Sequence, residues 1–384
     1  MLPKERVAAA YNHETPDKIP IYQASLSSAV ASYVLGRESY VGGGIQQYRE
    51  AVALWEGGEE AQQEFVDRSF EDACELCEVL DLDLVRTIHW RKPQMPAERI
   101  DENTFLYGDP GREEHWEIWR FDPPTETFGV VDKKPRPELT EVDLRRAAEE
   151  SIQRAEEYDP HPDDFPDLQR SVERFGDTRE IPGRAIGIAI PRDEEWLTAT
   201  ITHPDIVARY LQGRAMMSAK NAAVMVELGL PYCFGGGDFA GTKGPFYSPK
   251  VFHDLMLPAL KTISDGCHEV GAYHSFASDG DLWPVAEDLF GRSGVDAFYE
   301  VDRNFMDMRD LRKAFAPLTL IGGIRSEVLH VGTVEEVEEE TRSALQIAKE
   351  VGGCIIGCSN QVVKGTPEQN FWAMMEILHN ERTV

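Results

Sequence analysis

The sequence predicts a (β/α)8 barrel, an α/β fold in which eight parallel strands alternate with helices. Short apolar runs and helical patterns alternate along the 384 residues, giving about eight β/α units. No glycine fingerprint of a dinucleotide-binding sheet follows the first strand. Several of the apolar runs end in polar side chains of different chemistry. Because side chains at the carboxyl ends of barrel strands open onto one face, we expect the chemistry there.

The N-terminal region carries two predicted strands around a long helical segment. The run KIPIYQA follows a helix that ends near Pro16, and DLDLVRT follows a helical segment from Ile45 to Leu80. Cys74 and Cys77 form a CxxC in that segment and share one apolar helical stripe. No second CxxC completes a zinc site, so we expect both to be buried core residues.

The stretch from about residue 90 to residue 133 interrupts this alternation. Its runs ENTFLYGD, HWEIWRFD and FGVVDK are separated by Gly, Pro and Asp, which predicts an antiparallel β-hairpin insertion. A charged amphipathic helix follows from Glu138 to Glu157. We expect residues 1–384 to form a single domain, the barrel with this hairpin as an excursion.

The alternation is regular in the remaining part of the chain. The predicted strands are RAIGIAI, YCFGGGD, YHSFA, AFYEV, LTLIGG and CIIGC. The predicted helices between and after them span about 195–228, 249–270, 281–291, 307–315, 333–350 and 367–380.

The net charge of −29, from 39 basic and 68 acidic residues, argues against nucleic acid or an anionic membrane as a partner. No run of 18 or more apolar residues is present, and the first residues lack the apolar core of a signal peptide. We therefore expect a cytoplasmic protein.

Five candidate site residues follow predicted strands: Asp238, His274, Asp279, Arg325 and Cys358. Asp238 ends a strand among glycines, where an acidic side chain has few structural roles. Each of the other four also has a structural alternative. His274 could be a packed barrel residue and Asp279 a helix N-cap, while Arg325 could pair with a neighbouring acid and Cys358 could be a small buried hydrophobic residue. If these residues are functional, we expect all five side chains to converge on one cavity.

Aromatic residues near predicted strand ends are compatible with an apolar pocket suited to a ring-shaped substrate, although each also fits a barrel core. Those we expect to bind substrate, together with Arg325, are Tyr22, Trp90, Phe239 and Tyr247.

The segment ERVAAAYNHETPDKIPIY resembles the opening of the uroporphyrinogen decarboxylase superfamily. YSPKVFHDLMLPALK, SDGDLWPVAEDLFGRSGVDAF, MDMRDLRKAF, LIGGI and GTPEQNFWAM resemble later segments of the superfamily, in the same order. The resemblance implies a TIM barrel. True uroporphyrinogen decarboxylases carry an arginine-rich motif after the first strand, whereas the stretch IYQASLSSAVASYVLGR has no arginine before Arg37. Porphyrin decarboxylation is therefore not expected.

DLDLVR, RIDENTFLYGD and ETFGVVDK resemble the cobalamin-dependent methyltransferases of the superfamily, in particular the aryl-ether O-demethylases. That resemblance implies methyl transfer from a small methoxylated, aromatic donor to the Co(I) of a separate corrinoid protein. It also implies Zn²⁺, held by a His-x-Cys pair and a late cysteine, as a Lewis acid. Cys358 stands at the late position, but Ala277 and Asp279 stand where the pair is expected. The implied metal ligands are then His274, Asp279 and Cys358.

In this hypothesis a nearby acid supplies the proton. The alternative is a lyase that decarboxylates a small carboxylic acid without a metal. In that case Asp238 or Asp279 is the charge-stabilising or proton-transfer group, and Arg325 holds the carboxylate. The expected partners are the methyl donor and the corrinoid protein, and a homodimer is compatible with the sequence.

Overall fold

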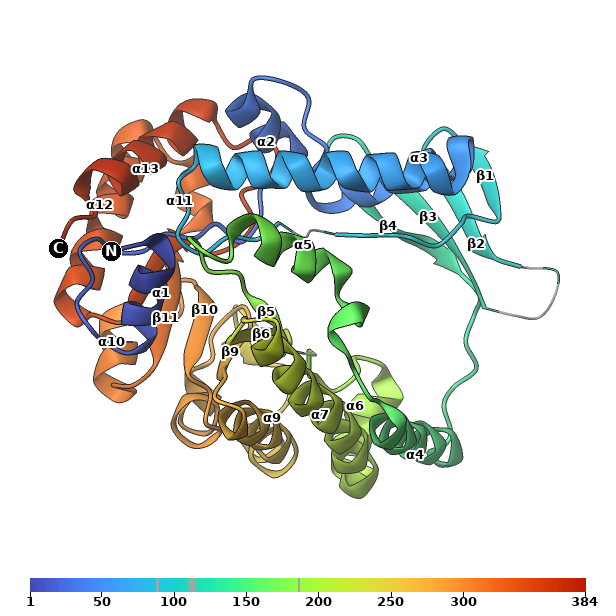
Figure 1. Ribbon diagram of the computed structural model, residues 1–384. Coiled ribbons are helices and arrows are strands. Elements are labelled where there is room, and N and C mark those ends of the chain that lie inside the picture. Colours follow the sequence, from blue (N-terminus) through green and yellow to red (C-terminus); the bar gives the residue numbers. More distant parts are fainter. Residues whose placement is uncertain (88–89, 110, 112–114, 186) are drawn as a thin grey trace.

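The computed structural model describes residues 1–87, 90–109, 111, 115–185 and 187–384, and its centre is a parallel sheet (Figure 1). Six strands pair in the order β12-β11-β10-β9-β6-β5, and every pairing in this sheet is parallel. The strands are β5 (Gly183–Arg184), β6 (Tyr232–Gly236), β9 (Tyr273–Ala277), β10 (Ala297–Val301), β11 (Thr319–Ile324) and β12 (Cys354–Cys358).

Two short segments lie between β12 and β5 and connect these two edge strands through isolated bridges. Ile21 forms a parallel bridge with Ile356 in β12, Tyr22 bridges Leu84, and Leu84 bridges Glu180, just before β5. The predicted α/β barrel class is confirmed, although its first two predicted strands form isolated bridges. The sheet is therefore not closed by a continuous ladder.

Helix α1 (Pro3–Tyr11) covers the amino-terminal end of the strands. The ring of Tyr11 lies 4.2 Å from that of Tyr232, at the start of β6, and its hydroxyl is 2.6 Å from Ser275 Oγ. Since α1 occupies this end, the opposite, carboxyl end of the strands is the mouth of the barrel.

The other helices surround the sheet (Figure 1). They are α2 (Ser28–Leu35), α3 (Gly43–Val79), α4 (Glu141–Glu157), α5 (Pro166–Phe175), α6 (Glu194–Thr202), α7 (Pro204–Glu227), α8 (Pro249–Val251), α9 (Leu257–Glu269), α10 (Met308–Ala314), α11 (Ser326–Val331), α12 (Val334–Val351) and α13 (Glu368–Glu381). The helix expected over 195–228 is two helices, because proline is favourable only in the first turn of a helix and Pro204 begins the second. The helix expected over 281–291 is instead a 3-10 turn followed by a π-helical segment.

The insertion is larger than the expected hairpin. It is a four-stranded antiparallel sheet of β1 (Glu98–Asp101), β2 (Thr104–Gly108), β3 (Trp116–Asp122) and β4 (Thr127–Lys133). Phe105, Phe121 and Phe128 of this sheet form an apolar cluster with Tyr48 of α3, which stacks on Phe121 at 4.3 Å. The insertion therefore has its own small cluster packed on α3. The assignment of residues 1–384 to a single domain stays a prediction.

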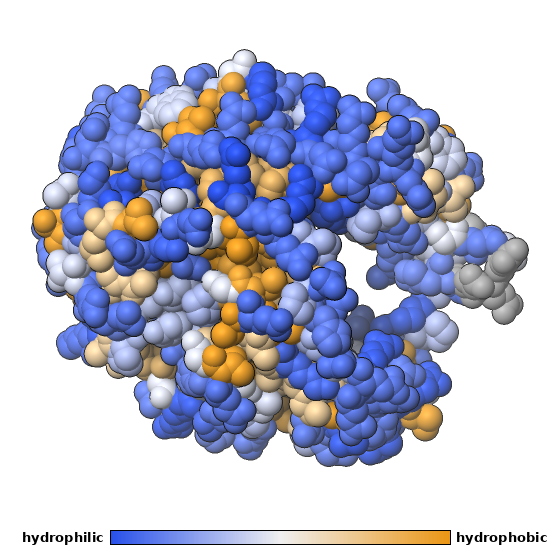
Figure 2. All heavy atoms as spheres, in the orientation of Figure 1, coloured by the Kyte–Doolittle hydropathy of each residue, from blue (hydrophilic) through white to orange (hydrophobic). Residues whose placement is uncertain are grey.

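Figure 2 shows a gap between the insertion and the region of α4, with mostly hydrophilic residues around it. Cys74 and Cys77 are 1% and 3% exposed, so the prediction that they are buried is confirmed. Among the described residues, no helix combines the length and apolar character that a membrane crossing requires.

Candidate active site

Three loops that follow strands of the sheet bring polar groups to the mouth. Asp238 follows β6, and Asp279 follows β9 and accepts hydrogen bonds of 3.3 and 3.4 Å from the amide of Asn360, after β12. Burial raises the pKa of Asp279, and the nearby carboxylates of Asp238 and Asp302 raise it further. The two predicted catalytic acids thus lie close enough to interact at the carboxyl end of the barrel.

Glu300 in β10 occupies an irregular backbone position. The register between β10 and β11 shifts between Tyr299 and Val301, and Glu300 has a φ of 66°. Positive φ is unfavourable for a residue with a β-carbon, and such bulges re-aim side chains. Within the described part of the chain, no donor lies within hydrogen-bond distance of the Glu300 carboxylate.

Glu300 interacts electrostatically with groups from several parts of the ring of strands. Burial raises its pKa to about 7; the charges of Asp279 and Asp238 add to this effect, and Arg86 opposes it. The charge of Glu300 in turn raises the pKa of Tyr22 and of Cys358. Glu300 is therefore a group that can hold a proton near neutral pH and release it.

A cavity of about 260 Å³ is lined by Tyr299, the residue before Glu300, and by Tyr22 and Arg86, with which Glu300 interacts electrostatically. Tyr22, Phe234 and Tyr299 wall it, with ring centroids 6.2 Å apart for Tyr22 and Phe234 and 4.6 Å apart for Phe234 and Tyr299. The Tyr299 hydroxyl donates to the carbonyl of Gly235 at 2.5 Å, which fixes its ring. Arg86 also lines the cavity and supplies a cation. Aromatic rings and polar groups both line this cavity, so it suits a small organic ligand that carries a polar substituent.

Comparison with known proteins identifies the family. The family model described as uroporphyrinogen decarboxylase (URO-D) matches residues 191–381, which include the loops after β6, β9, β10 and β12. The chain belongs to the uroporphyrinogen decarboxylase superfamily.

Solved structures agree with this assignment at the level of the fold. A methyltransferase from Methanosarcina mazei is 16% identical over 99% of this chain and 98% of its own, with a TM-score of 0.62. A putative vitamin-B12 independent methionine synthase from Listeria monocytogenes is 12% identical over 95% of this chain and 99% of its own. Its TM-score of 0.47 is too low to support a further argument. No curated protein matches the sequence.

In this superfamily member, the expected metal ligands are not brought together. His274 is 1% exposed, and its Nδ1 lies 2.8 Å from the Ser264 hydroxyl on α9, in the outer helical layer. Burial lowers its pKa to about 3, and His268 contributes to this shift. The described residues contain no group of three or more His, Cys, Asp or Glu side chains that could hold a metal ion. Because β9 directs His274 away from the mouth, the described residues do not bring His274, Asp279 and Cys358 together, and metal binding stays a prediction.

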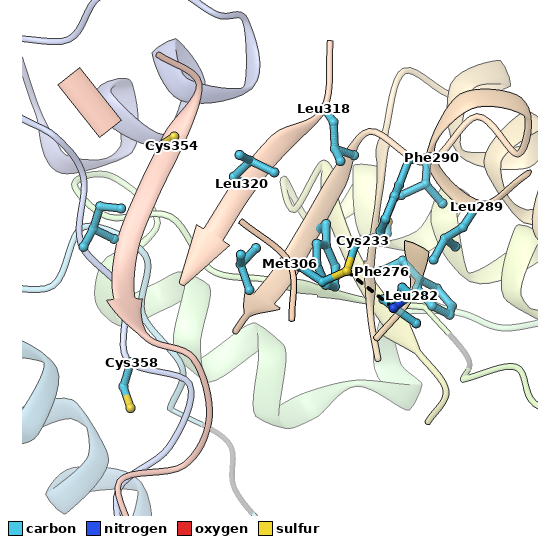
Figure 3. Close-up of a cluster of buried hydrophobic side chains, with 14 of the residues drawn as sticks. Cys233, Phe276, Leu282, Leu289, Phe290, Met306, Leu318, Leu320, Cys354 and Cys358 are labelled. Carbon is cyan, nitrogen blue, oxygen red and sulfur yellow. Dashed lines mark hydrogen bonds between the residues drawn. The ribbon is translucent and has the colours of Figure 1, made fainter. Parts of the chain in front are cut away.

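Cys358 lies at the mouth end of β12, opposite Cys354 at the start of the strand (Figure 3). Its backbone N–H donates to Gln23 Oε1 at 3.2 Å, and its side chain is 3% exposed. Burial raises the pKa of the thiol to about 12, so it stays protonated at neutral pH. Cys358 therefore lies near the candidate site, and the described residues place no set of metal ligands around it.

The expected substrate-binding residues divide into two groups. Tyr22 lines the cavity, as expected. Arg325 instead forms a bidentate pair with Glu340 of α12, at 3.0 and 2.7 Å, so its guanidinium is held by the helical layer. Phe239 is 1% exposed and packs against Phe276, and Tyr247 packs against Phe239. Both are core residues here.

Trp90 is 50% exposed and does not line the cavity. Sequence reasoning missed Arg86 and Phe234 as cavity residues and Glu300 as a site acid. Arg86 lies in the predicted strand DLDLVRT and Phe234 in the predicted strand YCFGGGD. These positions are the sequence signal that could have identified both as residues of the barrel interior. The bulge that re-aims Glu300 leaves no comparable sequence signal.

Proposed function

We propose that the chain is a methyltransferase. It takes the methyl group of a small methoxylated, preferably aromatic donor and passes it to the Co(I) of a separate corrinoid protein. The observation that carries the proposal is the cavity walled by Tyr22, Phe234 and Tyr299, which lie in the strands and bridges of the ring. Superfamily membership, which includes corrinoid-dependent methyltransferases, supports it as well.

In this proposal the cavity orients the donor. The rings of Phe234 and Tyr299 hold an aromatic donor by stacking, and Arg86 orients a polar substituent. The methyl group then points toward the mouth, because the partner's cobalt reaches the donor only from that side. The corrinoid supplies the nucleophile, and the chain binds and positions the donor and excludes water around it.

Methyl transfer to cob(I)alamin or to a corrinoid protein tests the proposal directly. With a series of phenyl methyl ethers as donors, the absorbance change from Co(I) to methyl-Co(III) should require the protein. Phe234→Leu should raise KM for the donor by removing a stacking surface. Phe290→Leu is the matched control, since Phe290 packs against Phe298 and Phe315 in the core and should affect stability alone. Absence of transfer with every ether and both acceptors would contradict the proposal.

Decarboxylation of a small carboxylic acid is the second candidate. Arg86 in the cavity favours it, because a guanidinium binds a carboxylate in bidentate geometry. Arg325 no longer fits this role, since Glu340 occupies its guanidinium. Release of CO2 from aromatic or aliphatic acids without any corrinoid acceptor would favour the lyase over the methyltransferase.

A further inference from the structure

We propose that Glu300 is a catalytic acid of this enzyme. In this proposal, which rests on the function proposed above, Glu300 replaces the Lewis-acid metal of the methyltransferases that the sequence resembles. Its carboxylic acid group donates a proton to the ether oxygen of the donor as the methyl group leaves. The reaction then needs no metal in the barrel.

The backbone of Glu300 supports a functional role. A φ of 66° and a shifted register set this residue apart from the rest of β10. Strained positions of this kind persist where the surrounding structure imposes them, and they are common at active sites. The bulge places the carboxyl group of Glu300 near Tyr22, Arg86 and Cys358, which come from three different parts of the ring.

The side chain of Glu300 lacks the partners that a structural carboxylate has. Glu340, for comparison, is held by Arg303 at 2.6 Å and Arg325 at 2.7 Å. No donor among the described residues reaches the Glu300 carboxylate within hydrogen-bond distance. The residue is only partly buried, so water or a ligand oxygen can reach this carboxylate.

The charges around Glu300 favour its protonated form. The titratable groups that interact electrostatically with Glu300 are Tyr22, Arg86, Asp238, Asp279, Tyr299 and Cys358. Asp302, two residues further along the chain, interacts with Asp279 and Cys358. Asp238 and Asp279 repel its negative form, burial disfavours that form further, and Arg86 opposes both effects. The resulting pKa of about 7 allows proton donation at neutral pH.

The chemical step balances with this single proton. The lone pair of Co(I) forms the Co–CH3 bond while the O–CH3 bond breaks, and the electron pair of that bond stays on oxygen. The oxygen takes the proton of Glu300, giving an alcohol or phenol and the Glu300 carboxylate. Asp279, which is exposed at the mouth and close enough to shift the pKa of Glu300, connects it to solvent for reprotonation.

The leaving group provides the decisive experiment. Wild type, Glu300→Gln and Glu300→Asp are compared on 2-methoxyphenol, which leaves as a poor, basic oxygen anion, and on 4-nitroanisole, whose leaving group needs little protonation. We expect Glu300→Gln to lower kcat for 2-methoxyphenol on the order of 100-fold or more, and for 4-nitroanisole by less than about tenfold. Glu300→Asp should recover part of the loss.

Glu180→Gln is the matched control. Burial also raises the pKa of Glu180 to about 7, but this residue lies near Tyr232 and Lys4, toward the amino end. It should not change the ratio of the two rates. Equal losses on both donors in Glu300→Gln would overturn the proposal. Activity lost on chelation and restored by Zn²⁺ would also overturn it.

Infrared spectroscopy separates this proposal from the function on which it rests. At pH 6 the wild type should show a protonated carboxylic acid band, part of which disappears in Glu300→Gln and remains in Glu59→Gln, a control at an exposed position of α3. If no ether is demethylated but this difference is present, the methyltransferase function fails while the proton on Glu300 stands. If the band does not change in Glu300→Gln, the proton donor assignment is wrong whatever the activity.

Discussion

Replacing Glu300 by glutamine should stabilise the folded protein at alkaline pH. The pKa of Glu300 is raised from 4.5 to about 7 in the folded chain, mainly by burial. Below pH 4.5 the group is protonated in both the folded and the unfolded state, and no penalty arises. Between pH 4.5 and 7 the folded state binds more protons than the unfolded state, so stability falls as pH rises. Each pKa unit corresponds to about 1.4 kcal/mol, so the loss above pH 7 amounts to about 3 kcal/mol.

Urea unfolding of the wild type and Glu300→Gln at pH 4.5 and pH 8 measures this effect. Glutamine cannot ionise, so the difference in unfolding free energy between variant and wild type should increase by about 3 kcal/mol from the lower to the higher pH. Glu59→Gln, at an exposed position of α3, is the control and should show no comparable change. A difference that stays constant between the two pH values would refute the assignment of Glu300 as a buried, proton-holding acid.

Three further predictions concern the ion pairs and the expected metal ligands. Arg382→Ala should cost about 3 kcal/mol in urea unfolding, because it removes a buried arginine from the buried carboxylate of Asp83 and leaves Arg6 as its cationic partner. Arg309→Ala, which breaks an exposed pair on α10, should cost less than about 1 kcal/mol, and equal losses would contradict this difference. The pKa of His274 is lowered to about 3, so its ring resonances in NMR spectra should not titrate between pH 5 and 8, whereas a midpoint near 6.5 would show an exposed ring. Cys358→Ser should leave methyl transfer within about tenfold of wild type, and a larger loss in the folded variant would return this thiol to the active site.

The sequence predicted the succession of elements better than their exact extent. Apolar runs bounded by glycine and helical patterns are local signals, so the strands β6, β9, β10, β11 and β12 were predicted at the correct places. The bridges at Ile21 and Leu84 depend on partners far away in the chain, and only single pairs form there. The splitting of one predicted helix at Pro204 was readable, because proline is unfavourable inside a helix.

The site was predicted less well because side-chain direction depends on register. Adjacent residues of a strand point to opposite faces, so an error of one residue exchanges the interior and the helical layer. His274 and Arg325 both follow this pattern: each lies at a predicted strand or strand end, and each is bonded to the outer layer through Ser264 or Glu340. Tyr22 was placed correctly.

Proton donation by Glu300 and binding of a metal cation at the mouth would require opposite protonation states of the same carboxyl groups. A cation among Asp238, Asp279 and Glu300 would favour their charged forms and lower their pKa values. Glu300 would then be a carboxylate at neutral pH and would have no proton to give. The raised pKa of Glu300 comes first from burial and then from the charges of Asp279 and Asp238, with Arg86 opposing them. Displacement of His274 into the helical layer and the bulge that turns Glu300 inward therefore act in the same direction. The first removes a metal ligand from the mouth, and the second brings in a group that can take over the activation of the leaving oxygen.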